Sequence, residues 1–150
     1  MTFSRSKILP IVVAALRIIL GGIFIYAGYI KLRDPWQLFA ASIASYEIVP
    51  MRVGEIVAKA FPWFELAMGV ALLIGRRLLP TAAVATVLML VFFNVMLWRA
   101  FLTGKEIDCG CFGPGEVLSW KTLVRDGSML AGALLVTWWT FVGQRRKSLA

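Results

Sequence analysis

The chain has 150 residues, of which 60% are hydrophobic, and a formal net charge of +8. Its mean hydropathy is +0.82, whereas soluble domains are only about 45–50% apolar, so the composition predicts an integral membrane protein and excludes an ordinary soluble domain. Basic residues beside apolar segments are typical of membrane topology, which argues against a nucleic-acid partner. We expect a single domain, residues 1–150, with the lipid bilayer as its surroundings.

Four apolar segments are each long enough to cross a bilayer as a helix, for which roughly 20 residues suffice. They comprise residues 8–30, 55–75, 78–101 and 119–142. The first is too long for the apolar part of a signal peptide and continues through Arg17 without a cleavage site close behind, so we expect it to be retained. Its small residues, Gly21, Gly22, Ala27 and Gly28, allow close contact with another helix. The sequence therefore predicts an all-α, four-transmembrane-helix bundle.

A short amphipathic segment follows the first span. Pro35 breaks the first helix, and apolar side chains then recur at helical spacing over residues 36–46. We expect a short helix here that lies at the membrane interface and that Pro50 ends, because proline cannot continue the hydrogen-bond ladder. Ser119 is placed to cap the last span, since its hydroxyl can accept a hydrogen bond from an amide near Thr122.

Basic residues without acidic neighbours mark one side of the membrane. They are Arg5, Lys7, Arg76, Arg77, Arg145, Arg146 and Lys147. By the positive-inside rule both termini are cytoplasmic and the protein is a multi-pass protein of the inner membrane. The loop at residues 103–117 then faces the periplasm or cell exterior, where dithiols can be oxidised.

That loop holds both cysteines of the chain, Cys109 and Cys111, separated by Gly110. Glycine permits the bend that would bring the two thiols together. A disulfide closed over so short a segment is expected to be strained, and strained, exposed disulfides are the easily reduced ones. The motif therefore favours a redox-active dithiol, with Cys109 and Cys111 as the catalytic residues.

Three other interpretations of the cysteines stay open. A structural staple gains little from closing a loop of three residues. Two inert thiols are the second alternative. A metal site needs about four ligands, commonly Cys and His, and the chain has no histidine, so we expect no metal.

Two charged residues fall inside the predicted spans at similar depths, roughly 14 Å from the cytoplasmic ends. They are Arg17 and Glu65. Intramembrane charges face the bundle and pair, so we expect these two to form an ion pair, either structural or part of a proton or substrate relay. Asn94 is expected to form a hydrogen bond between helices.

Basic residues near the loop can lower the pKa of a thiol. Lys105, Lys121 and Arg125 are the candidates, and Asp126 lies beside Arg125. Asp108 acts in the opposite sense on its neighbour Cys109, which favours Cys111 as the attacking thiol.

With these residues placed, the sequence resembles the DoxX-like superfamily and, within it, the methylamine utilisation protein MauE family. The resemblance covers nearly the whole chain and rests on the cysteine signature with Trp120, Arg125 and Asp126, and on residues of the first two spans and their loop. The latter are Arg17, Gly21, Phe24, Gly28, Lys31, Tyr46, Pro50, Pro62, Glu65, Gly69 and Gly75. Position 126 is Asp where the family pattern leads us to expect Asn, and the chain is shorter than many members.

The resemblance implies a four-helix membrane protein that supports maturation of periplasmic proteins through disulfide formation, as for the disulfide-rich small subunit of methylamine dehydrogenase. The implied partner is a periplasmic thioredoxin-like protein or a disulfide-containing client. No cofactor is evident from the residues, but DoxX-like relatives imply a quinone as a conceivable electron acceptor. Two alternatives stay open: a non-catalytic assembly or export factor, and a membrane subunit of a quinone-linked sulfur-compound oxidoreductase.

Overall fold

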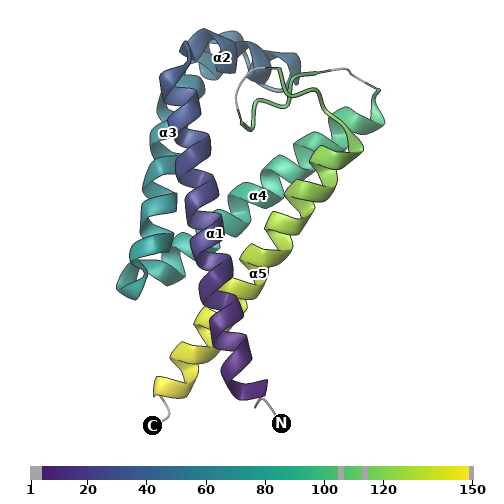
Figure 1. The fold of residues 1–150 in the computed structure, drawn as a ribbon. Helices are drawn as coiled ribbons and strands as arrows, with labels where there is room; N and C mark the ends of the chain where they lie inside the picture. The colour runs from purple at the N-terminus through teal and green to yellow at the C-terminus, as the bar shows by residue number, and fades with distance from the viewer. Residues whose placement is uncertain (1–4, 105–106, 113–114, 149–150) are drawn as a thin grey trace.

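The computed structural model describes residues 5–104, 107–112 and 115–148 (Figure 1). Its described part is all α apart from one short 3₁₀ helix, η1, and one isolated β-bridge. The elements in chain order are α1 (Arg5–Arg33), α2 (Trp36–Ser45), α3 (Met51–Ile74), η1 (Arg76–Leu78), α4 (Leu79–Leu102) and α5 (Trp120–Ser148).

Three of these helices are long and apolar enough to cross a membrane. They are Ile8–Arg33, Met51–Ile74 and Leu79–Leu102, which correspond to the first three predicted spans. The fourth predicted segment, residues 119–142, lies in α5, a helix of 29 residues, which does not reach the same apolarity over its described residues. The chain is thus a multi-pass membrane protein with three helices that meet these criteria.

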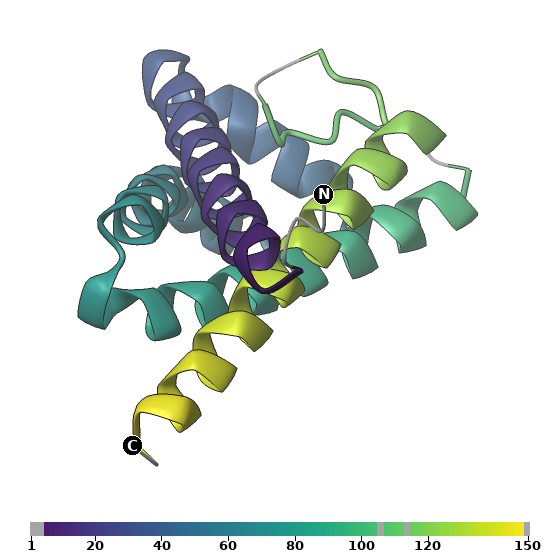
Figure 2. The same cartoon turned by 60° about the horizontal axis from the view of Figure 1, so that its bottom comes forward.

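The helices form two antiparallel pairs. Helix α1 packs chiefly on α3, α4 packs chiefly on α5, and contacts of α1 with α5 and of α3 with α4 join the pairs. Figure 1 shows both termini at one end, while α2 and the cysteine loop lie at the other. In Figure 2 the yellow end of α5 extends away from α3, so the end with the termini is splayed. The fold therefore places the cysteine loop at the end of the helices where α2 lies.

Glycines set the register between α1 and α3. A Cβ on Gly28 would lie 2.8 Å from the carbonyl oxygen of Pro62, and one on Gly69 would lie 2.7 Å from that of Gly21. Such distances leave no room for a side chain, so the two backbones approach as closely as small residues allow in lipid. The predicted close contact of the first span is confirmed at Gly21 and Gly28 but not at Gly22, where a Cβ would meet nothing within 4 Å.

This register makes the predicted Arg17–Glu65 ion pair wrong. Arg17 lies beside the C-terminal end of α3. A Cβ on Gly75, the residue that caps this helix, would lie 2.7 Å from the Arg17 Nη1 atom. The prediction counted both depths from the nominal starts of the spans, whereas the first turns of α1 project beyond α3. Glu65 instead pairs with Lys31, near the opposite end of α1.

The short helix predicted after the first span is confirmed as α2, but Pro50 does not end it. Helix α2 stops at Ser45, and Glu47 then adopts a positive φ of 54°. Pro50 occupies the N-cap position of α3, where a fixed φ suits the start of a helix. Its role is to begin the next helix rather than to end the previous one.

Candidate functional site

The cysteine loop folds back on itself beside the first turn of α5. The Cys109 amide donates to the Glu116 carbonyl, the Leu118 amide donates to the Ile107 carbonyl (each 2.9 Å), and Asp108 and Val117 form an antiparallel bridge. Apolar side chains beneath this fold-back form a small core of their own. Its buried members are Leu97, Ala100, Ile107, Cys109 and Leu118. The loop is therefore packed onto α4 and α5.

Gly110 makes the turn between the two cysteines. Its φ is +66°, and a Cβ there would lie 2.9 Å from the Ser42 Cβ of α2. Both the left-handed backbone and the close approach to α2 require glycine. The predicted bend at Gly110 is confirmed, and α2 forms one wall of the site.

The two cysteines are free and lie against each other. The Cys111 amide donates to the Cys109 sulfur at 3.4 Å, and the Cys111 Sγ lies 3.7 Å from the Cys109 carbonyl oxygen. Cys109 is buried, whereas Cys111 is partly exposed. A partner approaching from solvent therefore meets Cys111 first, and Cys111 stays our predicted attacking thiol.

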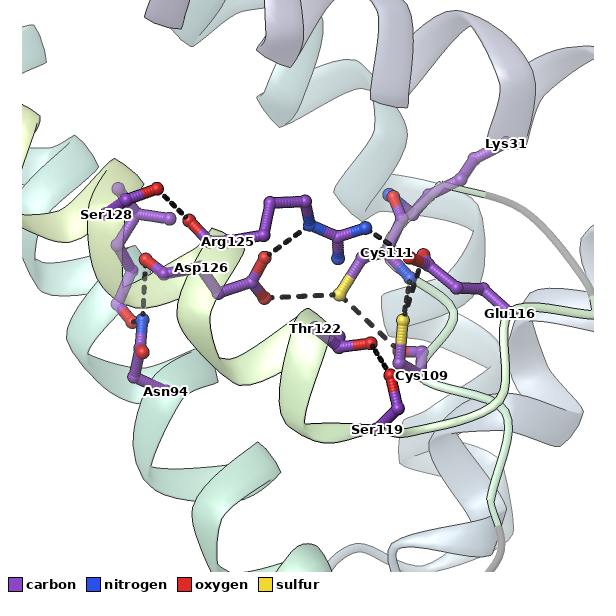
Figure 3. A network of polar contacts seen from close by, with 11 residues as sticks. Lys31, Asn94, Cys109, Cys111, Glu116, Ser119, Thr122, Arg125, Asp126 and Ser128 are labelled. Atoms are coloured by element: carbon purple, nitrogen blue, oxygen red, sulfur yellow. Dashed lines mark hydrogen bonds and ion pairs between the residues drawn. The ribbon is translucent and has the colours of Figure 1, made fainter.

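Each thiol faces a carboxylate, and one guanidinium holds both carboxylates (Figure 3). Cys109 donates to Glu116 at 3.2 Å, and Cys111 donates to Asp126 at 3.7 Å. Arg125 donates to Asp126 at 2.9 Å and also to Glu116. Its guanidinium carbon lies 4.5 Å from the centre of the Phe112 ring, a cation–π contact. Charges of both signs therefore surround the dithiol.

The backbone carbonyls of the two cysteines accept hydrogen bonds from Lys31 of α1 and from Tyr46, which follows α2. The Lys31 ammonium group donates to the Cys111 carbonyl at 2.6 Å and to both Glu65 oxygens, at 2.9 and 3.0 Å. The Tyr46 hydroxyl donates to the Cys109 carbonyl at 3.3 Å. Lys31 thus links a buried ion pair between α1 and α3 directly to the cysteine loop.

The predicted supporting residues separate into those near the thiols and those away from them. Arg125 and Asp126 lie at the thiols, whereas Lys121 is exposed on the first turn of α5. Glu65 reaches the loop only through Lys31. Arg17 lies at the far end of α3. Lys105 lies outside the described residues.

Two further predictions concern side chains of α4 and α5. The Asn94 amide donates to the Asp126 carbonyl at 3.3 Å, which confirms its predicted bond between helices. Ser119 directly precedes α5 as predicted, but its hydroxyl lies 3.3 Å from the Thr122 hydroxyl, whereas the predicted partner was a backbone amide. The Asp108 carboxylate accepts hydrogen bonds from the Gly110 and Gly115 amides.

Sequence reasoning missed three residues of the site: Lys31, Tyr46 and Glu116. Lys31 and Tyr46 are part of the family pattern noted above, which was a usable signal for a role beyond the membrane interface. Glu116 is brought to Cys109 by the fold-back of the loop, and the sequence carries no comparable signal for it.

Electrostatics favour the protonated form of Cys111. A hydrogen bond with Cys109 and burial raise the pKa of the Cys111 thiol well above its ordinary value, and the nearby Asp126 charge acts in the same direction. Lys31 opposes these effects. Burial likewise raises the pKa of Tyr46, which stays a neutral hydrogen-bond donor. Because the thiolate is the nucleophile, Cys111 needs help to lose its proton.

Two cavities adjoin the cysteines. One of about 40 Å³ lies below Cys111, and Lys31, Glu65 and Asp126 contribute to its lining; since one water needs about 10–15 Å³, it has room for water. The other, about 180 Å³ and almost wholly apolar, extends from Cys109 under α2 between α3 and α4. Within the described ranges, no group of three or more His, Cys, Asp or Glu side chains is arranged to hold a metal ion.

The fold and the site together define a multi-pass membrane protein that carries a dithiol on a packed loop at one end of its helices. The sequence profile of the methylamine utilisation protein MauE family matches residues 9–139. The chain belongs to this family.

Individual relatives agree with this assignment at modest identity. The chain is 31% identical to a methylamine utilization protein MauE of Paracoccus denitrificans over 129 residues, which cover 85% of this chain and 69% of the relative. It is 27% identical to the protein of the same name from Methylorubrum extorquens over 131 residues, 86% and 70% of the two chains. No solved structure matches.

Proposed function

We propose that this protein is a membrane thiol:disulfide redox protein whose Cys109–Cys111 pair exchanges with a disulfide or dithiol of a periplasmic partner. The observation that carries the proposal is the packing of the two cysteines across Gly110, where the Cys111 amide donates to the Cys109 sulfur and each thiol is hydrogen-bonded to its own carboxylate. A structural staple has no use for proton acceptors at both sulfurs. The similarity to methylamine utilization proteins supports a role in maturing a protein of methylamine metabolism.

The same proposal includes the topology. Helix α5 would be the fourth span, since 29 residues extend about 43 Å and the hydrocarbon core is about 30 Å thick. Arg77 and both termini lie at the end away from the dithiol, so the positive-inside rule puts that end in the cytoplasm of the inner membrane. The cysteine loop then faces the periplasm, where an exchange partner of thioredoxin-like or client type is available.

The chemistry proposed is exchange through a mixed disulfide. One thiolate attacks a sulfur of the partner's disulfide, and the partner's other sulfur leaves as a thiolate. The second cysteine of the pair then attacks the mixed disulfide, which closes the Cys109–Cys111 disulfide and releases the partner as a dithiol. The reverse sequence oxidises a partner dithiol. Cys111, the more exposed thiol, is assigned the first attack.

Trapping of the mixed disulfide tests the proposal. In Cys109→Ser the resolving thiol is missing, so Cys111 should retain its partner as a reductant-sensitive band of higher mass on a non-reducing gel. Cys111→Ser should trap less, because Cys109 is buried. Lys121→Gln, an exposed change on α5, serves as the control and should trap nothing.

Function in cells is tested by complementation. A Paracoccus denitrificans strain that lacks its own related protein should regain growth on methylamine with the wild-type chain and with Lys121→Gln, but not with the double serine variant. Full growth with the double serine variant, together with no trapped partner, would refute exchange chemistry and leave a docking or assembly factor.

A further inference from the structure

The Arg125 guanidinium occupies the position between the Glu116 and Asp126 carboxylates. Its Nε donates to Asp126 Oδ1 at 2.9 Å, and its Nη1 donates to Glu116 Oε1. Glu116 comes from the returning arm of the loop and Asp126 from α5, so Arg125 joins two segments of the chain. A planar guanidinium has N–H groups in fixed directions, which fixes the orientation of both carboxylates.

The second oxygen of each carboxylate faces a different thiol. Glu116 Oε2 lies 3.2 Å from Cys109 Sγ, and Asp126 Oδ2 lies 3.7 Å from Cys111 Sγ (Figure 3). An ionised carboxylate only accepts hydrogen bonds, and a thiol has one S–H to donate. Each thiol therefore has a carboxylate oxygen within reach of its proton, and the Cys111 Sγ lies equally near, at 3.7 Å, to the Cys109 carbonyl oxygen.

Bulk water has little access to one thiol and one carboxylate of the site. Cys109 is 2% exposed and Asp126 is 4% exposed, whereas Cys111 is partly exposed and adjoins the small cavity. The raised pKa of Cys111 means that few thiolates exist at neutral pH without an internal acceptor. Exchange needs the thiolate, so proton removal is part of the reaction that the site has to perform.

We propose that Glu116 and Asp126 are the catalytic proton acceptors of Cys109 and Cys111, respectively, and that Arg125 is the positioning residue that aims both. The proposal rests on the dithiol exchange proposed above and names the groups that make it feasible in a buried site. A base within hydrogen-bond reach of the proton it removes is the geometry that general-base catalysis requires.

The protons and electrons of the reaction balance as follows. The Cys111 proton passes to Asp126 Oδ2 as the sulfur attacks the partner's disulfide, and the partner's leaving sulfur departs as a thiolate. The Cys109 proton passes to Glu116 Oε2 as that sulfur displaces the partner from Cys111. The partner's disulfide gains two electrons, the cysteine pair loses two, and both protons leave the carboxylic acids for the partner's thiolates or for water.

A pH profile of alkylation distinguishes this role from a structural one. If the carboxylate removes the proton during attack, the rate follows the thiol–carboxylate form, whose fraction stays constant between the two macroscopic pKa values. In the Cys111→Ser background, the rate at which iodoacetamide modifies Cys109 should therefore change less than about twofold from pH 6 to pH 8. After Glu116→Gln the rate should rise about tenfold per pH unit, since it now follows the thiolate fraction alone.

The companion experiment uses Cys111 in the Cys109→Ser background, where Asp126→Asn should steepen the profile. Asparagine keeps the backbone carbonyl that Asn94 binds, so the helix contact survives. Each amide variant should leave the other thiol's profile within about threefold. Among the described residues, the titratable groups around the pair are Lys31 and Glu65 from α1 and α3, Tyr46, Glu116, Arg125 and Asp126.

Controls and contrary outcomes are defined by the same measurement. Asp108→Asn is the matched control, because that carboxylate binds loop amides rather than a thiol, and both profiles should stay flat. Arg125→Gln should steepen both profiles. Arg125→Lys should return at most one of them to the flat form, since an ammonium group lacks the N–H groups in fixed directions that bind two carboxylates at once. A parent profile that already rises tenfold per pH unit, or amide variants that react faster at every pH, would show that the carboxylates only repel the thiolates and would overturn the proposal.

The alkylation profile needs no exchange partner. Loss of the proposed function, seen as no trapped partner and full growth of the double serine variant, would leave these profiles unchanged. Failure of proton transfer would alter the profiles while a partner could still be trapped. The two proposals can therefore fail separately.

Discussion

Replacement of Lys31 by methionine tests how the cysteine loop is tied to the helices. The Lys31 and Glu65 side chains are 2% and 6% exposed, so solvent does not screen their pair. Methionine leaves Glu65 as an unpaired buried carboxylate and removes the donor to the Cys111 carbonyl. Because breaking a buried pair from one side costs about 3–5 kcal/mol, we expect Lys31→Met to lower the free energy of unfolding by at least about 3 kcal/mol.

The double variant separates the charge pair from the loop contact. Lys31→Met with Glu65→Leu removes both charges, and replacement of a buried pair by apolar side chains is commonly neutral or stabilising. The double variant should therefore recover most of the loss and keep a deficit of roughly 1–3 kcal/mol for the unmet Cys111 carbonyl. SDS-induced unfolding in detergent micelles, followed by circular dichroism, gives the four free energies of the cycle.

Arg17 supplies the matched control. It lies at the other end of α3 from Glu65, so the effects of Arg17→Gln and Glu65→Gln should add within about 0.5 kcal/mol. Strong coupling between Arg17 and Glu65, with none between Lys31 and Glu65, would refute the register of α1 on α3 and the ion pair that follows from it.

Three further outcomes are expected. The hydrogen bond with Cys109 and burial raise the pKa of Cys111, so the folded state retains a proton that the unfolded state releases. The free energy of unfolding of the reduced protein should therefore be highest below the ordinary thiol pKa and fall as the pH rises through the raised one. This pH dependence should be absent in Cys111→Ser. Gly110→Ala should cost more stability than Gly104→Ala, since their φ values are +66° and +65° but only Gly110 lacks room for a Cβ; equal losses in thermal unfolding would contradict that packing. In a cysteine-free background, Lys121→Cys should react with an impermeant maleimide in spheroplasts and Arg77→Cys only after lysis, and the opposite pattern would invert the topology.

The sequence predicted the local features of the fold because each has a local cause. The first three apolar spans, the amphipathic helix after Pro35 and the bend at Gly110 all follow from composition, spacing and backbone freedom within a few residues. Pro50 was misinterpreted because a proline between two helices can either end one or begin the next.

The candidate site was predicted at its centre but not in its surroundings. Cys109, Cys111, Arg125 and Asp126 lie together as their closeness in sequence suggests. The error at Arg17 arose because charge depth was counted along each helix, whereas the packing of glycines between helices decides which residues face each other. Gly28, three residues before Lys31, was a better guide to register than the charges were.

The ammonium group of Lys31 has three protons, and three acceptors receive them: two oxygens of Glu65 and the carbonyl of Cys111. If the loop lifts, one of these protons is left without an acceptor in a medium of low dielectric constant, at a cost of roughly 1–3 kcal/mol. The hydrogen bonds of Lys31 therefore favour the position of the loop against α1 and α3. A partner that reacts directly with the buried sulfur of Cys109 has to supply this free energy to displace the loop. A partner that receives the electrons through Cys111 can react while the loop stays in place.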